Sequence, residues 1–67
     1  QYEKSIYYCE QILPFMDSHG LKGTIHYATT CLNVANAYRA AGEWSASLQY
    51  YEEVKNIYDK IFRYIKI

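Results

Sequence analysis

The amino-acid sequence predicts an all-α fold of three helices, arranged as antiparallel helix-turn-helix repeats, of which the chain contains about one and a half. Three observations support this prediction. Apolar residues recur at alternating spacings of three and four, which places them on one face of a helix. No segment alternates apolar and polar residues with a period of two, so strands are not expected. The chain also resembles itself when it is shifted so that Ser5 falls on Ser47.

The first helix is expected over residues 1–16. Pro14 should kink or end it, because the proline ring clashes with the preceding turn. Residues 17–23, which contain two glycines, an aspartate and a serine, are then expected to form a loop. The apolar positions that share one helical face are Ile6, Cys9, Ile12 and Met16.

The middle helix is expected over residues 24–41. Thr24 is a suitable N-cap because its hydroxyl can accept a hydrogen bond from a free backbone N–H of the first turn. Gly42 is a suitable C-terminal stop because glycine tolerates the left-handed conformation that ends many helices. The apolar face consists of Tyr27, Cys31, Val34, Tyr38 and Ala41.

The last helix is expected over residues 45–66, with Ser45 as its N-cap and no helix-breaking residue after it. The segment Gly42-Glu43-Trp44 is so short that the middle and last helices must form an antiparallel hairpin. The predicted apolar face of this helix is Leu48, Tyr51, Val54, Tyr58, Ile61 and Ile65.

The internal repeat relates the first helix to the last one. Residues 5–12 fall on residues 47–54 with three of eight positions identical, and Tyr2 falls on Trp44, so that an aromatic residue precedes both segments. We therefore interpret the first segment as the second helix of a preceding unit.

The stretch from Cys31 to Val54 resembles the tetratricopeptide repeat. Val34-Ala35 stands at the family's Leu-Gly position, and Gly42-Glu43-Trp44 matches its Gly-acidic-aromatic turn. The family's closing proline is absent, and this departure, with the long period, looks most like the repeats of the kinesin light chain type. The resemblance implies an α-solenoid that acts as an interaction module. It assigns repeat packing to Cys31, Val34, Ala35, Tyr38, Trp44, Ser47, Tyr51 and Val54, with Ala35 and Ser47 where the helices cross most closely.

A polar stripe lies opposite the apolar face of the middle helix, at about 100° per residue. The resemblance implies that this side looks into the concave groove of the array, where it would bind a peptide segment of another protein. Amide groups both donate and accept, so Asn33 and Asn36 suit a peptide backbone, and Arg39 suits a carboxylate. The candidate peptide-binding residues are Thr29, Asn33, Asn36, Arg39 and Ala40.

The end of the last helix is apolar on more than one side and predicts self-association of the fragment. The residues proposed for this contact are Tyr58, Ile61, Phe62 and Ile65, in a helix end that also contains Ile67. The alternative contact surface is Tyr2, Ile6 and Cys9 at the other end of the chain. Two alternatives to the peptide-binding scaffold therefore stay open: a structural self-association element, and a peptide-sensing repeat domain of a larger regulator or enzyme.

Composition argues against other functions. Seven basic residues balance seven acidic ones, and the basic residues are scattered, so neither nucleic acid nor a membrane surface is an expected partner. Nine tyrosines are interpreted as packing residues for thin helical layers. Two cysteines are too few for a disulfide scaffold, which favours a reducing cytoplasm.

Neither catalysis nor a metal or cofactor is expected. Cys9, His19, His26 and Cys31 lack the close paired spacing of zinc ligands, and both cysteines fall on apolar helical faces. Asp17-Ser18-His19 contains the residue types of a hydrolase triad, but adjacent residues cannot align base, nucleophile and acid.

Overall fold

The computed structural model describes residues 2–65 of the chain. Within this range the fold is all-helical, as predicted: α1 spans Tyr2–Ser18, α2 spans Ile25–Ala40 and α3 spans Trp44–Tyr64. The last helix was expected to reach residue 66, but it ends at Tyr64 with Ile65 as its C-cap. Gln1, Lys66 and Ile67 lie outside the described residues. No helix within residues 2–65 is long and apolar enough to cross a membrane.

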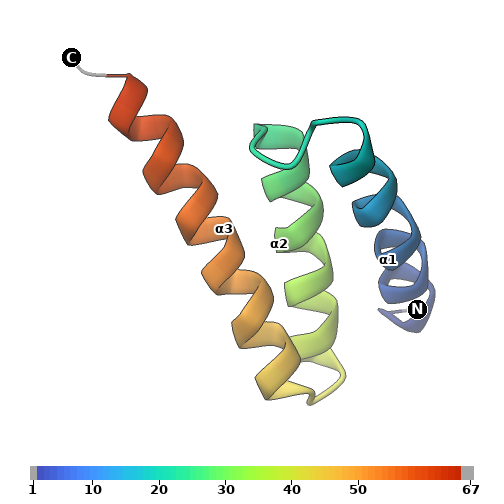
Figure 1. The fold of residues 1–67 in the computed structure, drawn as a ribbon. Helices are drawn as coiled ribbons and strands as arrows, with labels where there is room; N and C mark the ends of the chain where they lie inside the picture. Colours follow the sequence, from blue (N-terminus) through green and yellow to red (C-terminus); the bar gives the residue numbers. More distant parts are fainter. Residues whose placement is uncertain (1, 66–67) are drawn as a thin grey trace.

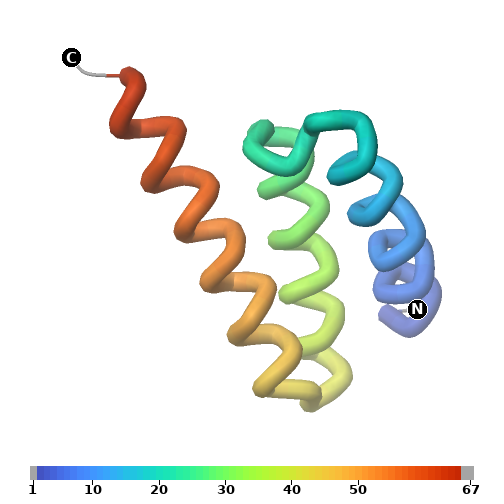
Figure 2. Tube along the Cα trace, in the orientation of Figure 1, coloured from blue at the N-terminus to red at the C-terminus, as the bar shows by residue number. Residues whose placement is uncertain are grey.

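The central helix, α2, packs against both of its neighbours, and successive helices run antiparallel (Figure 1). The Cα traces of α1 and α3 nowhere approach each other within 8 Å, so α2 alone connects the two outer helices at the level of the backbone. α3 leans away from α2 toward its C-terminal end, which the tube view shows most clearly (Figure 2). α1 and α3 therefore cover one side of α2 and leave its other side exposed.

Pro14 does not end α1. The helix continues to Ser18, so Asp17 and Ser18 are helical and not part of the predicted loop. The missing N–H of a proline leaves the carbonyl of the residue four positions earlier, here Glu10, without its intrahelical donor. Because Glu10 and Pro14 both lie on the exposed side of α1, water can hydrate that carbonyl.

Glycine closes the C-terminal ends of α1 and α2, as predicted for Gly42. Gly42 has a φ of +82°, its N–H donates to the carbonyl of Arg39, and the N–H of Glu43 donates to the carbonyl of Tyr38 at 2.9 Å. These two bonds satisfy carbonyls that have no partner further along the helix. Gly20, with a φ of +74°, closes α1 through the same pair of bonds.

The predicted N-cap of α2 is confirmed, and that of α3 is wrong. The Thr24 hydroxyl accepts a hydrogen bond from the N–H of Tyr27 at 3.2 Å. α3 begins at Trp44, and the residue at its cap, Glu43, makes no side-chain capping bond. The glycine closure of α2 already reverses the chain at this point, so α3 starts one residue earlier and Ser45 lies within its first turn.

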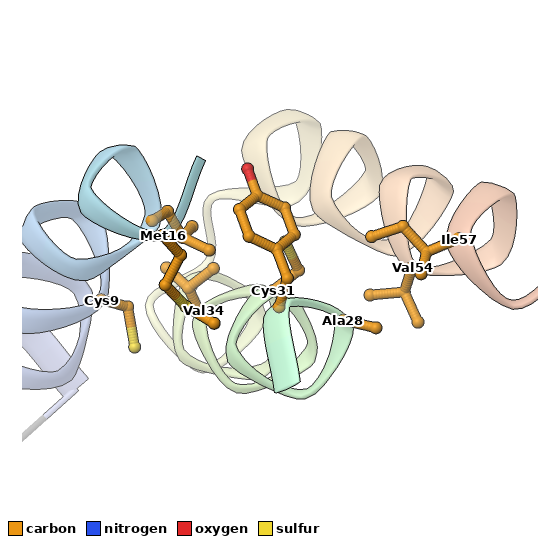
Figure 3. Packing of buried hydrophobic residues seen from close by; sticks show 9 residues of the cluster. Cys9, Met16, Ala28, Cys31, Val34, Val54 and Ile57 are labelled. Carbon is orange, nitrogen blue, oxygen red and sulfur yellow. The ribbon is translucent and has the colours of Figure 1, made fainter. Parts of the chain in front are cut away.

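The hydrophobic core lies along α2 and draws on all three helices. Figure 3 shows Cys9 and Met16 of α1 on one side of the α2 residues, with Val54 and Ile57 of α3 on the other side. The largest fully buried side chain is Val34. The core cluster consists of Cys9, Leu13, Met16, Tyr27, Ala28, Cys31, Val34, Val54 and Ile57.

The apolar face predicted for α3 is partly wrong. Leu48 is 58% exposed, whereas Ser47 and Ile57, which the apolar pattern did not include, are buried. Compared with the predicted face, the buried face of α3 is rotated away from Leu48 and toward Ser47, the small residue that contacts α2. Of the predicted packing residues, Trp44 is also contradicted: it is 66% exposed in the first turn of α3 and fills no space between helices.

The close crossing of α2 and α3 occurs where it was predicted. The Ser47 hydroxyl donates a hydrogen bond to the backbone carbonyl of Ala35 at 2.9 Å. Ala35 is fully buried and Ser47 is 2% exposed. Small side chains at both positions let the two backbones approach closely enough for this bond.

Candidate functional site

The predicted polar stripe of α2 faces away from the core. Its members share high exposure, on a helix whose opposite face is buried. About half of the α2 surface is therefore packed, while the other half is free to meet another molecule. The exposed stripe residues are Thr29, Asn33, Asn36, Arg39 and Ala40.

Asn36 is oriented by a contact that the sequence analysis did not anticipate. The hydroxyl of Tyr51, on α3, donates a hydrogen bond to the side-chain oxygen of Asn36. This bond leaves both N–H groups of the Asn36 amide for a partner. The side chains of Asn33 and Arg39 make no hydrogen bond or ion pair within residues 2–65, so no internal partner has to be displaced before they bind.

The C-terminal end of α3 is a second exposed surface, and an apolar one. Tyr58 and Ile61 are half-buried against the core, whereas Phe62 is 65% exposed, Tyr64 is 91% exposed and Ile65 is 55% exposed. The rings of Tyr58 and Phe62 stack with their centroids 6.2 Å apart. The lean of α3 away from α2 produces this exposure, because the last turns of α3 have no neighbouring helix to cover them.

A cluster of two tyrosines and one carboxylate joins all three helices. The hydroxyl of Tyr38 on α2 donates to the carboxylate of Glu10 on α1, and the hydroxyl of Tyr50 on α3 donates to the same carboxylate at 3.5 Å. The two rings stack with centroids 5.8 Å apart. The hydrogen bond to Glu10, followed by burial, raises the pKa of Tyr38 to about 12.

The sequence analysis missed this cluster. The high tyrosine content was noticed, but the residues are 28 and 40 positions from Glu10, and no local spacing connects them. The cluster fixes α1 and α3 to a common point even though their backbones do not touch.

The two cysteines are buried thiols, as predicted. Cys9 and Cys31 are both free, and burial raises the pKa of each, with Cys31 reaching about 11. A thiol with such a pKa is almost entirely protonated at neutral pH and is a poor nucleophile and ligand. Among the described residues, no group of three or more His, Cys, Asp or Glu side chains is placed to hold a metal ion.

The Asp17-Ser18-His19 segment lies at the end of α1. The Ser18 hydroxyl donates to the carbonyl of Phe15 at 2.8 Å, and Nδ1 of His19 lies 2.8 Å from the same carbonyl oxygen. A carbonyl oxygen only accepts, so Nδ1 of His19 carries the proton in this contact. The hydroxyl and the imidazole Nδ1–H therefore both satisfy the same carbonyl at the helix end. Oγ of Ser18 and Nδ1 of His19 also lie 3.1 Å apart, but in this arrangement the hydroxyl proton is donated to the carbonyl of Phe15.

Comparisons of the chain with protein-family models, with curated protein sequences and with solved structures found no match. The interpretation of these surfaces therefore depends on their own geometry and chemistry.

Proposed function

We propose that the chain is part of a protein-binding helical scaffold of the tetratricopeptide type, acting in the cytoplasm, in which the polar stripe of α2 binds an extended segment of a partner protein. One observation carries the proposal: the amide- and guanidinium-bearing side of α2 is exposed and almost free of internal contacts, while three-helix packing holds the helix rigidly from the other side. The free, buried thiols support a reducing compartment.

The stripe matches the chemistry of a peptide backbone. Asn33, Asn36 and Arg39 follow one another at intervals of three residues, so they span roughly 9 Å along the helix axis. An extended peptide covers that distance with about three residues. The two amides would bond to its backbone groups, and the guanidinium of Arg39 would hold a carboxylate in a bidentate pair.

A rigid surface makes this contact efficient. The stripe residues stand on a helix that is already ordered, and Tyr51 already restricts the rotamer of Asn36. Little conformational entropy is lost when a peptide binds to such a surface, so each hydrogen bond contributes more to affinity.

A random-peptide display library selected on the 67-residue chain tests the proposal. We expect enriched peptides whose Kd rises about 5- to 100-fold when Asn33 and Asn36 are both replaced by alanine, because each neutral hydrogen bond contributes about 0.5–1.5 kcal/mol. Gln11→Ala, which removes an exposed amide from α1, is the matched control and should leave the Kd unchanged.

A second control separates binding from orientation. Tyr51→Phe removes the hydroxyl that bonds to Asn36 but keeps the ring and the amide. If the Asn36 amide contributes through direct bonds to the peptide, Tyr51→Phe should weaken binding less than the double alanine variant does, because the amide is still present. Peptides that bind the double alanine variant and the unaltered chain equally well would refute the role of the stripe.

The exposed end of α3 favours a second candidate function, self-association of the chain. Phe62 and Ile65 present an apolar surface on a helix end that no neighbour covers. Sedimentation velocity over a range of concentrations should show a monomer–oligomer equilibrium that Phe62→Ser with Ile65→Ser abolishes. A monomer at all concentrations would reject this candidate and leave the peptide-binding proposal unaffected.

A further inference from the structure

A hollow lies between α1 and α3, over the side of α2 opposite the polar stripe. It consists of two adjoining pockets of about 350 Å³ and 240 Å³ that share the side chains of Tyr27 and Tyr50. The hollow exists because the backbones of α1 and α3 stay apart while both pack on α2. The other residues used in the argument below are Glu10, Asp17, Lys22 and Glu53.

The charged residues around the hollow are mostly acidic. Glu10 and Asp17 line it from α1 and Glu53 from α3, against a single ammonium, that of Lys22 in the preceding loop. Glu10 already accepts hydrogen bonds from two tyrosines. The carboxylates of Asp17 and Glu53 make no hydrogen bond or ion pair with any other described residue. Two carboxylates on opposite walls are therefore free.

The floor of the hollow contains a buried tyrosine, Tyr27, whose hydroxyl has no hydrogen-bond partner among the described residues. Tyr27 is 8% exposed, and its hydroxyl makes no hydrogen bond to another residue of the described chain. No side-chain oxygen or nitrogen in that part of the chain is both fully buried and unpaired, so this hydroxyl must reach solvent, and Tyr27 lines both pockets of the hollow.

The surroundings of Tyr27 are electrically negative. Burial makes the largest contribution to raising the pKa of Tyr27, and the neighbouring Cys31, Glu53 and Asp17 raise it further. Carboxylates on both walls thus already disfavour a negative charge at the hydroxyl. The same field favours a cation and disfavours an anion or a phosphate.

We propose that this hollow binds an organic cation, the ammonium of a lysine or the guanidinium of an arginine side chain presented by a partner protein. The rings of Tyr27 and Tyr50 line the hollow and would contact the cation, the Tyr27 oxygen would accept a hydrogen bond, and Asp17 and Glu53 would neutralise the charge. The aliphatic part of the side chain lies against the apolar walls, which Leu13 and Pro14 contribute.

The site is separate from the polar stripe. At about 100° per residue, Tyr27 and Asn36 are about 180° apart around α2. A partner that fills the hollow therefore leaves the stripe free, and the inference does not depend on peptide binding there.

An NMR titration of the isotope-labelled chain tests the inference with four probes: a capped tripeptide with a central lysine, its arginine and norleucine counterparts, and butylammonium. We expect the lysine and arginine peptides to shift the amide signals of Tyr27 and Tyr50 with a Kd on the order of 1 mM, falling in affinity as salt is added. The norleucine peptide should cause no such shift. Comparable binding of butylammonium would show that a free amine also suffices, and its failure would show that the peptide backbone contributes.

Charge variants make the test specific. Glu53→Gln and Asp17→Asn should each raise the Kd about two- to fivefold. Glu52→Gln changes the net charge equally on an exposed position of the same helix outside the hollow, and it should change the Kd less than about twofold. Lys22→Gln should lower the Kd, because it removes the cation that competes for the same carboxylates.

Three results would overturn the inference. The first is equal binding of the lysine and norleucine peptides. The second is an equal loss in the Glu52→Gln and Glu53→Gln variants, which would indicate only a general charge effect. The third is weaker binding after Lys22→Gln. Circular dichroism should confirm that each variant keeps the helical content of the unaltered chain, as expected because the replaced side chains retain solvent exposure.

Discussion

Replacement of Ser47 measures how closely α2 and α3 approach. The side chain is 2% exposed and donates to the carbonyl of Ala35 at 2.9 Å. Ser47→Ala removes one hydrogen bond, which contributes about 0.5–1.5 kcal/mol, and alanine regains a few tenths through its helix propensity. We therefore expect a loss of stability of about 1 kcal/mol or less.

Ser47→Val should cost much more. The variant loses the same hydrogen bond and adds a branched side chain against Ala35, which has no exposed surface and cannot move toward solvent. Overpacking of this kind costs about 1–3 kcal/mol, so the total is about 2–4 kcal/mol. A chain of this length is stable by roughly 3–10 kcal/mol, so valine would remove a large share of that stability.

Urea denaturation followed by circular dichroism at 222 nm gives the free energy of unfolding of each variant. Ser45→Ala and Ser45→Val are the matched controls, since Ser45 is exposed in the first turn of the same helix. These controls should differ from each other by less than about 1 kcal/mol, from propensity alone. If Ser47→Val were as stable as Ser47→Ala, the two helices would not be in close contact at this point, and the argument for the crossing would be wrong.

Gly42→Ala should lower the free energy of unfolding by about 1 kcal/mol because φ is +82°, whereas Gly23→Ala, without a positive φ, should not; urea titrations compare the two. Tyr38 has a pKa of about 12, above its ordinary 10, because it donates to Glu10. Its contribution to stability is therefore full below about pH 10 and is lost as the pH rises through 12, and thermal unfolding across this range should show a smaller loss in Tyr38→Phe. The buried thiols, of which Cys31 has a pKa of about 11, should react with dithiobis(nitrobenzoate) at pH 8 at least about tenfold more slowly in the folded chain than in urea. Equal rates in the two states would refute their burial.

Much of the fold could be predicted because its determinants are local. Helical periodicity and the short Gly42-Glu43-Trp44 turn predicted three antiparallel helices, and Thr24 and Gly42 correctly marked the two ends of α2. The errors at Pro14 and Ser45 are also local. α1 continues past Pro14 because the carbonyl that loses its donor is on the exposed side of the helix. α3 begins before Ser45 because the closure at Gly42 has already reversed the chain.

The candidate sites divide in the same way. The exposure of Asn33 and Asn36 follows from the angle of 100° per residue on a helix whose apolar face is known, so the sequence was sufficient to predict it. The bond from Tyr51 to Asn36 and the exposure of Trp44 depend on the rotation of α3 relative to α2. Packing at Ser47 sets that rotation, and the periodicity of the apolar residues does not predict it because Ser47 is not one of them.

The sequence by itself determined that this chain forms three helices and which face of α2 is buried, because these properties depend on spacings of a few residues along a helix. The close crossing at Ala35 and Ser47 was expected only from the resemblance to the tetratricopeptide repeat. Only the tertiary structure decided that Glu10 meets Tyr38 and Tyr50, and that α1 and α3 stay apart over Tyr27. Such contacts join residues far apart in the chain, and their geometry depends on the angle at which the helices pack. That angle results from many side-chain contacts between helices, so no single segment of the sequence predicts it.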